Sequence, residues 1–222
     1  MTPPPEILPI FPLTGVLLLP GMWLPLHVFE PRYRNMVEDA RAGDSHIGMI
    51  QPVVPREDNQ PPPGSPPESP EVYLVGCAGR IEQCDRLEDG RYYIQLQGVT
   101  RFRIVEELPL LRGYRRVRAD YAPFPADAAP PSAAMDTARL IEALLRFGQA
   151  NNLPFDGARL RELPGGALIN GLSMSLPFGP AEKQALLEAA GLDERQSLLL
   201  TLLGMGVRAR TETPATAPPT LN

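Results

Sequence analysis

The chain has 222 residues, of which 43% are hydrophobic, and carries a formal net charge of −5. This length is enough for one domain or two small ones with a true hydrophobic core. The acidic balance argues against a general nucleic-acid binder, because phosphate contacts need clustered lysine and arginine, but it does not exclude a local basic patch.

The sequence gives no sign of a membrane segment. No charged leader followed by an apolar run opens it, and the late apolar stretch at 198–207 is too short and too interrupted to span a bilayer. We therefore expect a cytoplasmic protein.

Cysteine, histidine and lysine are scarce. Cys77 and Cys84 are too few for a disulfide framework and are spaced unlike a zinc module, so we expect both to be reduced. His27 and His46 lie in no metal-binding pattern. The single lysine, Lys183, stands outside any phosphate-binding loop, and we expect it to be a solvated charge. The sequence thus predicts neither a metal nor a cofactor.

The first part of the chain, residues 1–124, has the pattern of short strands. Prolines among its opening apolar residues predict bent strands at sheet edges, since proline has no N–H to donate to a ladder. The predicted strands cover residues 16–19, 24–29, 46–54, 72–77, 80–87, 91–97, 101–105 and 114–121. We expect a turn at 88–90, a bend at 98–100 and a closed or half-closed barrel rather than a parallel sheet.

One helix and one loop interrupt these strands. Tyr33, Met36, Val37 and Ala40 recur at helical spacing, and Gly43 is placed to end the helix that they predict. Residues 55–70 are so rich in proline, glycine, serine and charge that we expect a mobile loop.

The second part, residues 125–210, has a helical pattern. Ser132 is placed to cap a first helix, one or two shorter helices are expected within 157–176, and Gly179 and Asp193 precede two more. We expect a small helical bundle followed by a disordered tail at 211–222.

Four stretches together resemble the amino-terminal domain of the ATP-dependent Lon proteases, in its shorter stand-alone bacterial form. They are residues 8–13 with Pro20 and Gly21, residues 24–33, residues 98–104 and residues 182–188. The resemblance spans residues 6–205 and implies an α+β protein, in which a PUA-like β-barrel precedes a small α-helical bundle. It also implies recognition of protein substrates, without the ATPase module and the Ser-Lys proteolytic domain of the full protease.

Our leading hypothesis is a non-catalytic module that binds an unfolded segment or a partner protein near the junction of barrel and helices. Met22 and Trp23 follow a bend at which large side chains can be exposed, although Trp23 could equally cover the edge of the core. Tyr33 and Arg101 complete the candidate partner-binding residues. Tyr33 also fits the core, and alternation in its strand places Arg101, like Arg103, on a solvated face.

The rival hypothesis is RNA binding, because PUA-like barrels often contact RNA. A basic run with neighbouring tyrosines supports it: Arg112, Arg115, Arg116 and Arg118. Strand alternation divides this run between two faces, and the acidic chain offers little electrostatic steering, so we rank it below protein binding.

An enzyme is the third and least supported class. Asp85, Glu88 and Asp89 lie at a predicted hairpin tip, where carboxylates usually form turns. Ser173 and Ser175 have no histidine near them in the sequence. We therefore expect no catalytic residue.

Overall fold

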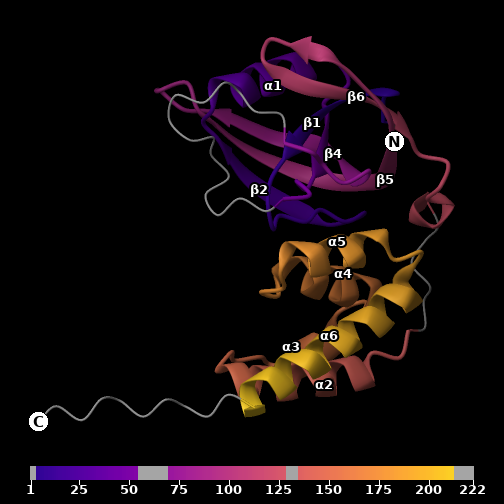
Figure 1. Cartoon of the computed structure of the whole chain (residues 1–222). Coiled ribbons are helices and arrows are strands. Elements are labelled where there is room, and N and C mark those ends of the chain that lie inside the picture. The colour runs from indigo at the N-terminus through magenta and orange to yellow at the C-terminus, as the bar shows by residue number, and fades with distance from the viewer. Residues whose placement is uncertain (1–3, 55–69, 129–134, 213–222) are drawn as a thin grey trace, which may run out of the picture.

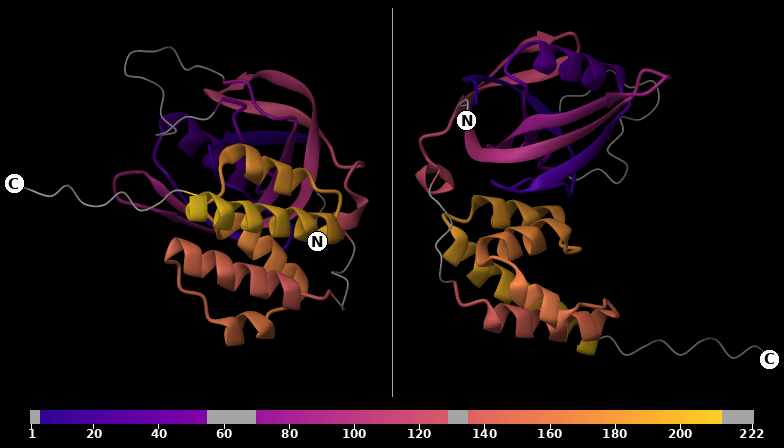
Figure 2. Two further views of the ribbon diagram at one scale, coloured as in Figure 1. Left: turned by 60° about the horizontal axis from the view of Figure 1, so that its bottom comes forward. Right: turned by 180° about the vertical axis from the view of Figure 1, so that it is seen from behind.

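A computed structural model describes residues 4–54, 70–128 and 135–212. Almost all of the predicted loop at 55–70, the predicted cap Ser132 and most of the predicted tail at 211–222 lie outside these residues. The described part has a β-barrel and a group of helices beside it, with α4 and α5 next to the barrel in Figure 1 and in the right view of Figure 2.

The first part of the chain forms the six strands and helix α1, and the remaining helices follow in the sequence. The strands are β1 Ile7–Pro12, β2 Trp23–Val28, β3 His46–Ile50, β4 Val75–Arg86, β5 Tyr92–Leu111 and β6 Tyr114–Asp120. The helices are α1 Pro31–Ala42, the short 3₁₀ helix η1 Pro125–Ala128, α2 Ala138–Asn151, α3 Gly157–Glu162, α4 Gly165–Ser175, α5 Pro180–Glu188 and α6 Leu192–Glu212.

The sheet is mixed and closes on itself through β5. Its strand order is β2-β5-β4-β3-β1-β6, and β5 also pairs with β6. The first part of β5 pairs with β2 and β4, whereas its last part pairs with β6, which its 20-residue length allows. The barrel is therefore closed, and β2 remains outside the ring as an edge strand. Residues 98–100 do not separate two strands, because β5 runs through them. The predicted bend corresponds to an irregularity within β5, where Gly98 and Thr100 pair with the adjacent residues Gly79 and Ala78 of β4.

The opening segment folds differently from the prediction. Residues 7–12 form β1, while the predicted strand at 16–19 is an irregular segment with Leu17, Leu18 and Leu19 buried. Strand β1 lies inside the sheet and still tolerates its prolines. Residues 7–10 pair with β6 and residues 10–12 with β3, so Pro9 and Pro12 each have a paired strand on one side only.

The buried leucines close the end of the barrel that faces the helices. A Cβ at Gly98 would lie 2.1 Å from the carbonyl oxygen of Leu19, so only glycine fits where this segment crosses β5. The leucines join one hydrophobic cluster with the helical residues Leu144 and Leu186. The irregular segment thus links two parts of one core.

Helix α1 confirms its prediction. Pro31 occupies its first turn, Gly43 caps its end, and its buried residues are Tyr33, Met36, Val37 and Ala40. The prediction worked because the pattern is local.

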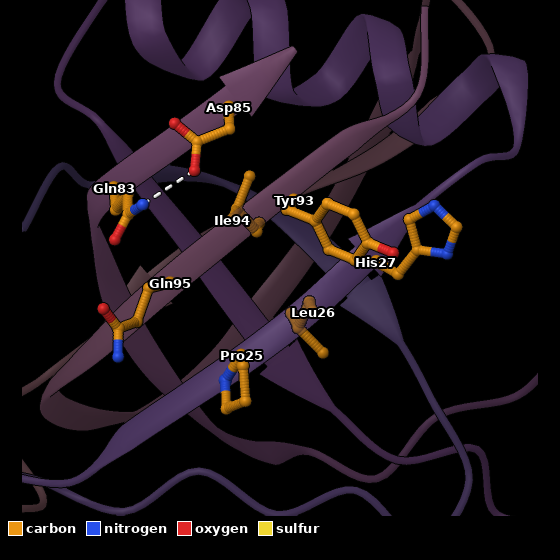
Figure 3. Close-up of a pocket in the computed structure, with 8 residues that line it drawn as sticks. All are labelled: Pro25, Leu26, His27, Gln83, Asp85, Tyr93, Ile94 and Gln95. Atoms are coloured by element: carbon orange, nitrogen blue, oxygen red, sulfur yellow. Dashed lines mark hydrogen bonds between the residues drawn. The ribbon is translucent and has the colours of Figure 1, made fainter. Parts of the chain in front are cut away.

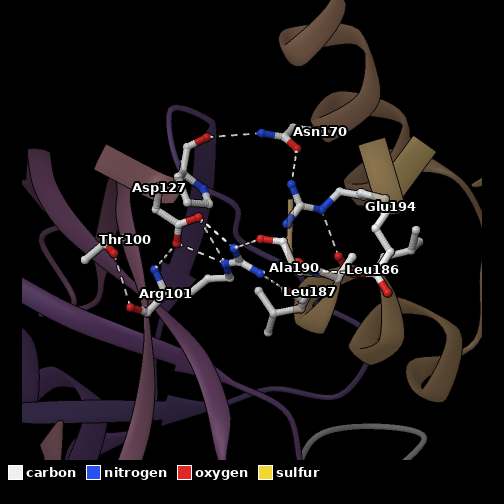
Figure 4. Close-up of polar contacts among 11 residues, drawn as sticks. Thr100, Arg101, Asp127, Asn170, Leu186, Leu187, Ala190 and Glu194 are labelled. Carbon is white, nitrogen blue, oxygen red and sulfur yellow. Dashed lines mark hydrogen bonds and ion pairs between the residues drawn. The ribbon is translucent and has the colours of Figure 1, made fainter. Parts of the chain in front are cut away.

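Arg101 corrects the expected solvated face of β5. Its side chain is 1% exposed, because η1 and the end of α5 cover β5 there. The guanidinium binds both carboxylate oxygens of Asp127 and lies 4.6 Å from the centre of the Phe124 ring. It also donates to the carbonyl oxygens of Leu187, Ala189 and Ala190 (Figure 4). Arg101 therefore joins the barrel to the open carbonyl end of α5.

A second buried arginine extends this junction. Arg195 of α6 donates to Leu186 O at 2.8 Å and to Asn170 Oδ1 at 2.9 Å, and Asn170 donates to Pro20 O (Figure 4). Burial, and then the neighbouring Arg101 cation, lower the pKa of Arg195 to about 10. The carboxylates of Asp127 and, more weakly, Glu194 act in the opposite direction on Arg195.

Lys183 is not the solvated charge that we expected. Its Nζ, on α5, donates to Gly15 O at 2.9 Å and to Met174 O at 3.2 Å, and the side chain is half-buried. Burial lowers its pKa below the ordinary 10.5. Lys183 therefore ties Gly15, which directly precedes the irregular segment, to α4 and α5.

Removing Arg101 should destabilise the fold. We expect Arg101→Met to lower the free energy of unfolding by about 3–5 kcal/mol, because Asp127 is left as a buried charge without its partner. The pair Arg101→Met with Asp127→Leu should recover part of this loss, since it removes both charges. Urea unfolding measures both effects. A loss below about 1 kcal/mol in the single variant contradicts this role for Arg101.

Lys183 should give stability a specific alkaline pH dependence. Between its lowered native pKa and 10.5, the native state binds fewer protons at Lys183 than the unfolded chain does, so its contribution to stability rises with pH. The unfolding free energy of the wild type minus that of Lys183→Met should therefore become more positive as pH approaches 10.5. The tyrosines titrate in both proteins, so their effect cancels when the unfolding free energy of the variant is subtracted from that of the wild type. A difference that stays constant or falls with pH contradicts the burial of this ammonium group.

Candidate binding surface

The four candidate binding residues do not form one surface. Trp23 is 47% exposed, whereas Tyr33 is buried with its ring 4.2 Å from that of Phe11. Arg101 lies inside the junction. Met22 is half-buried and faces α4, where its methyl group would lie 3.6 Å from a Cβ at Gly171. Of the four, Trp23 offers the most surface to a partner.

Trp23 belongs to a face that β2 shares with β5 and β4. Alternate residues of β2 lie beside alternate residues of β5, and two residues of β4 continue the same rows. We call this set the β2–β5 face: Trp23, Pro25, His27, Gln83, Asp85, Tyr93, Gln95 and Gln97. It follows from strand geometry, since side chains of every second residue project from the same side of a sheet.

The β2–β5 face contains a shallow hollow of about 450 Å³ (Figure 3). The rings of His27 and Tyr93 stack along it with centroids 4.6 Å apart, and Phe29 lies 5.9 Å from His27. Tyr93 is 51% and Phe29 46% exposed. Gln83 donates to Asp85 at 2.7 Å within the hollow. Aromatic surface therefore lies beside amides and one carboxylate, a mixture typical of protein-binding sites.

The charge of the hollow is simple. Asp85 is the only carboxylate among its eight lining residues, and neither lysine nor arginine lines it. Such a lining suits a neutral or basic ligand better than an acidic one.

Reaction chemistry has little support in the described residues. They hold no group of three or more histidine, cysteine or acidic side chains that could bind a metal ion. Ser173 is buried and donates to the backbone carbonyl of Ile169. Burial raises the pKa of the thiols of Cys77 and Cys84, both of which are free cysteines of β4, so neither is an activated nucleophile.

The basic run is largely neutralised by acidic neighbours. Arg112 pairs with Glu38 and Asp39, Arg115 with Glu107, and Arg118 with Glu6 and Glu106. Arg116 donates to the carbonyl oxygen of Pro109. These contacts tie β6 and the turn before it to α1, β5 and the amino-terminal residues, so the run is mainly structural.

The sequence contained part of the signal for this surface. Apolar residues alternate along the predicted strand at 91–97, at Tyr92, Ile94 and Leu96, and this alternation puts Tyr93 on the opposite side of the strand. What it lacked was the pairing of β2 with β5, which brings Trp23, His27 and Tyr93 onto one side of the sheet.

None of the helices in residues 4–54, 70–128 and 135–212 has both the length and the apolar character needed to cross a membrane.

Comparison with known proteins identifies the family. Residues 7–204 match the model of the ATP-dependent protease La (LON) substrate-binding domain. Lon protease 2 of Sorangium cellulosum is 30% identical over 210 residues, which are 91% of this chain and 25% of that protein. The Lon protease of Flavobacterium johnsoniae is 26% identical over 86% of this chain and 23% of its own length. The chain thus spans about a quarter of these relatives.

Solved structures share the fold. The Lon N-terminal domain protein from Xanthomonas campestris matches with a TM-score of 0.57 and 24% identity, over 88% of this chain and 97% of that one. The N-terminal domain of the Mycobacterium avium complex Lon protease matches with a TM-score of 0.62 and 19% identity, over 90% and 98%. The α+β prediction of a barrel with helices is confirmed. The chain belongs to the Lon substrate-binding domain family.

Proposed function

We propose that this chain binds polypeptide segments that lack stable structure, without chemical change, and that the β2–β5 face is where they bind. The observation that carries the proposal is the exposure of two aromatic residues on one face. Tyr93 lines the hollow, which has no lysine or arginine among its lining residues, and Trp23 lies two residues along β2 from the lining residue Pro25. Large exposed aromatic side chains contribute most of the energy in many protein interfaces. Membership of a substrate-binding family supports the same role.

The central strand of the β2–β5 face is held by strand pairing on both of its sides. β5 is held by pairing with β2 and β4 along the whole hollow, so Tyr93 and Gln95 stand on a fixed sheet. Because the sheet is already ordered, it loses little conformational entropy on binding, and the entropy cost comes mainly from the unfolded segment. A partner without stable structure can then adapt its shape to the hollow.

Trp23→Ala should weaken binding of an unfolded protein. With fluorescein-labelled reduced, carboxymethylated ribonuclease A as the probe, we expect at least ~10-fold weaker binding by fluorescence anisotropy, equivalent to about 1.4 kcal/mol. Leu110→Ala is the matched control, because Leu110 is 51% exposed on the distant part of β5. Equal weakening in both variants, or in neither, contradicts the proposal, and circular dichroism checks that both are folded.

RNA binding should be absent. Because Arg112, Arg115 and Arg118 already pair with carboxylates, a labelled single-stranded RNA should show no saturable binding even at low salt. Binding that falls steeply with salt and disappears in Arg118→Glu would establish the rival hypothesis instead. Arg146→Glu is the control for overall charge, since Arg146 is exposed on α2 and pairs with Glu142.

A further inference from the structure

The outer edge of β2 is open. β2 is the terminal strand of the sheet order, and among the described residues no other strand pairs with it on the side away from β5. An unpaired edge presents backbone N–H and C=O groups that can pair with another chain.

The identity of the open groups follows from the ladder. Gly98 N donates to Met22 O at 2.8 Å, which is one of the two bonds of a hydrogen-bonded pair. Gly98 O accepts from Gly21 N in place of Met22 N, which donates instead to Leu19 O. In an antiparallel ladder such pairs alternate, and the register then makes Leu24–Leu96, Leu26–Ile94 and Val28–Tyr92 the bonded pairs. The backbone groups of Trp23, Pro25 and His27 must therefore point outward.

Pro25 fits this arrangement. It occupies an outward position, where its missing N–H removes nothing from the β2–β5 ladder. The open edge then offers two donors, the N–H groups of Trp23 and His27, and three acceptors, the carbonyls of Trp23, Pro25 and His27. The same three residues carry their side chains on the β2–β5 face.

We propose that an extended polypeptide segment adds as a strand to the outer edge of β2. This inference rests on the proposed function and specifies its mode. The backbone of the segment bonds to Trp23, Pro25 and His27, while every second side chain lies on the side of the β2–β5 face. Recognition through backbone groups accepts many sequences, which suits a module for unfolded segments. The aromatic rings of Trp23 and His27 then favour apolar side chains.

A second copy of this chain is a poorer occupant. In a two-fold pairing centred on Pro25, the two prolines lie opposite each other, and neither has an N–H to donate, so two hydrogen bonds are missing. With an ordinary segment, only the hydrogen bond that Pro25 would donate is missing. Two copies also repel each other, since each carries a net charge of −5. The same charge, with Asp85 in the hollow, favours a neutral or basic segment.

Amide hydrogen exchange tests this mode residue by residue. The probe is a synthetic peptide of about eight residues in which phenylalanine alternates with threonine, with arginine at each end, a length typical of a strand. At saturation we expect exchange at the Trp23 and His27 amides to slow at least ~10-fold, because these N–H groups become hydrogen-bonded. The amides of Leu24 and Leu26, already bonded to β5, should not change and serve as internal controls.

N-methylation of the peptide gives an independent measurement. Methyl groups on the amides of one alternate set should weaken binding at least ~10-fold, while methyl groups on the other set should have little effect, because only one set faces β2. The side chains are the same in both peptides. Equal affinities contradict edge pairing.

Different results would overturn edge pairing at β2 and the proposed function of the β2–β5 face. A peptide that binds in a Trp23-dependent way without slowing exchange at Trp23 and His27 lies on the face, so edge pairing is wrong and the proposed function stands. A peptide that does not bind overturns edge pairing, while the ribonuclease assay decides the proposed function separately. Protection that rises with protein concentration without peptide identifies a second copy as the occupant and also overturns the inference.

Discussion

The pairing of β5 on both of its sides is the constraint on which the structure depends. This strand pairs with β2 and β4 over its first part and with β6 over its last, so it closes the barrel and leaves β2 outside the ring. One strand therefore supplies Tyr93 to the exposed face and Arg101 to the buried junction. The position of the candidate binding surface follows from how the barrel closes.

The junction and the β2–β5 face, both built on β5, differ in which side chains are buried and which are exposed. At the junction, Arg101 and Asp127 are buried together and join β5 to the end of α5. At the β2–β5 face, Trp23 and Tyr93 remain exposed, and Asp85 is the only carboxylate of the hollow. Buried ion pairs fix geometry more than they add net stability, whereas exposed aromatic groups are available for association. The fold thus separates its structural charges from its candidate binding groups.

The parts predicted correctly from sequence are those with local patterns. Helix α1 follows from apolar spacing and its end glycine, and β2 lies within one residue of the predicted 24–29. Long-range contacts explain the errors. Residues 16–19 have the composition of a strand but are buried as a plug against Gly98, far away in sequence. Arg101 and Lys183 were expected in solvent, and both are covered by elements from the other part of the chain. Of the four candidate site residues, Trp23 alone is strongly exposed, because exposure depends on tertiary packing.

The fluorescence of Trp23 tests the central claim most directly. Trp23 is the only tryptophan of the chain, so its emission reports on the β2–β5 face alone. Reduced, carboxymethylated ribonuclease A contributes no tryptophan emission as a ligand. As it binds, the emission should shift to shorter wavelength, with a midpoint that matches the anisotropy titration, because the partner removes water from the indole ring. Saturable binding that leaves the emission unchanged would place the binding site elsewhere and contradict the account.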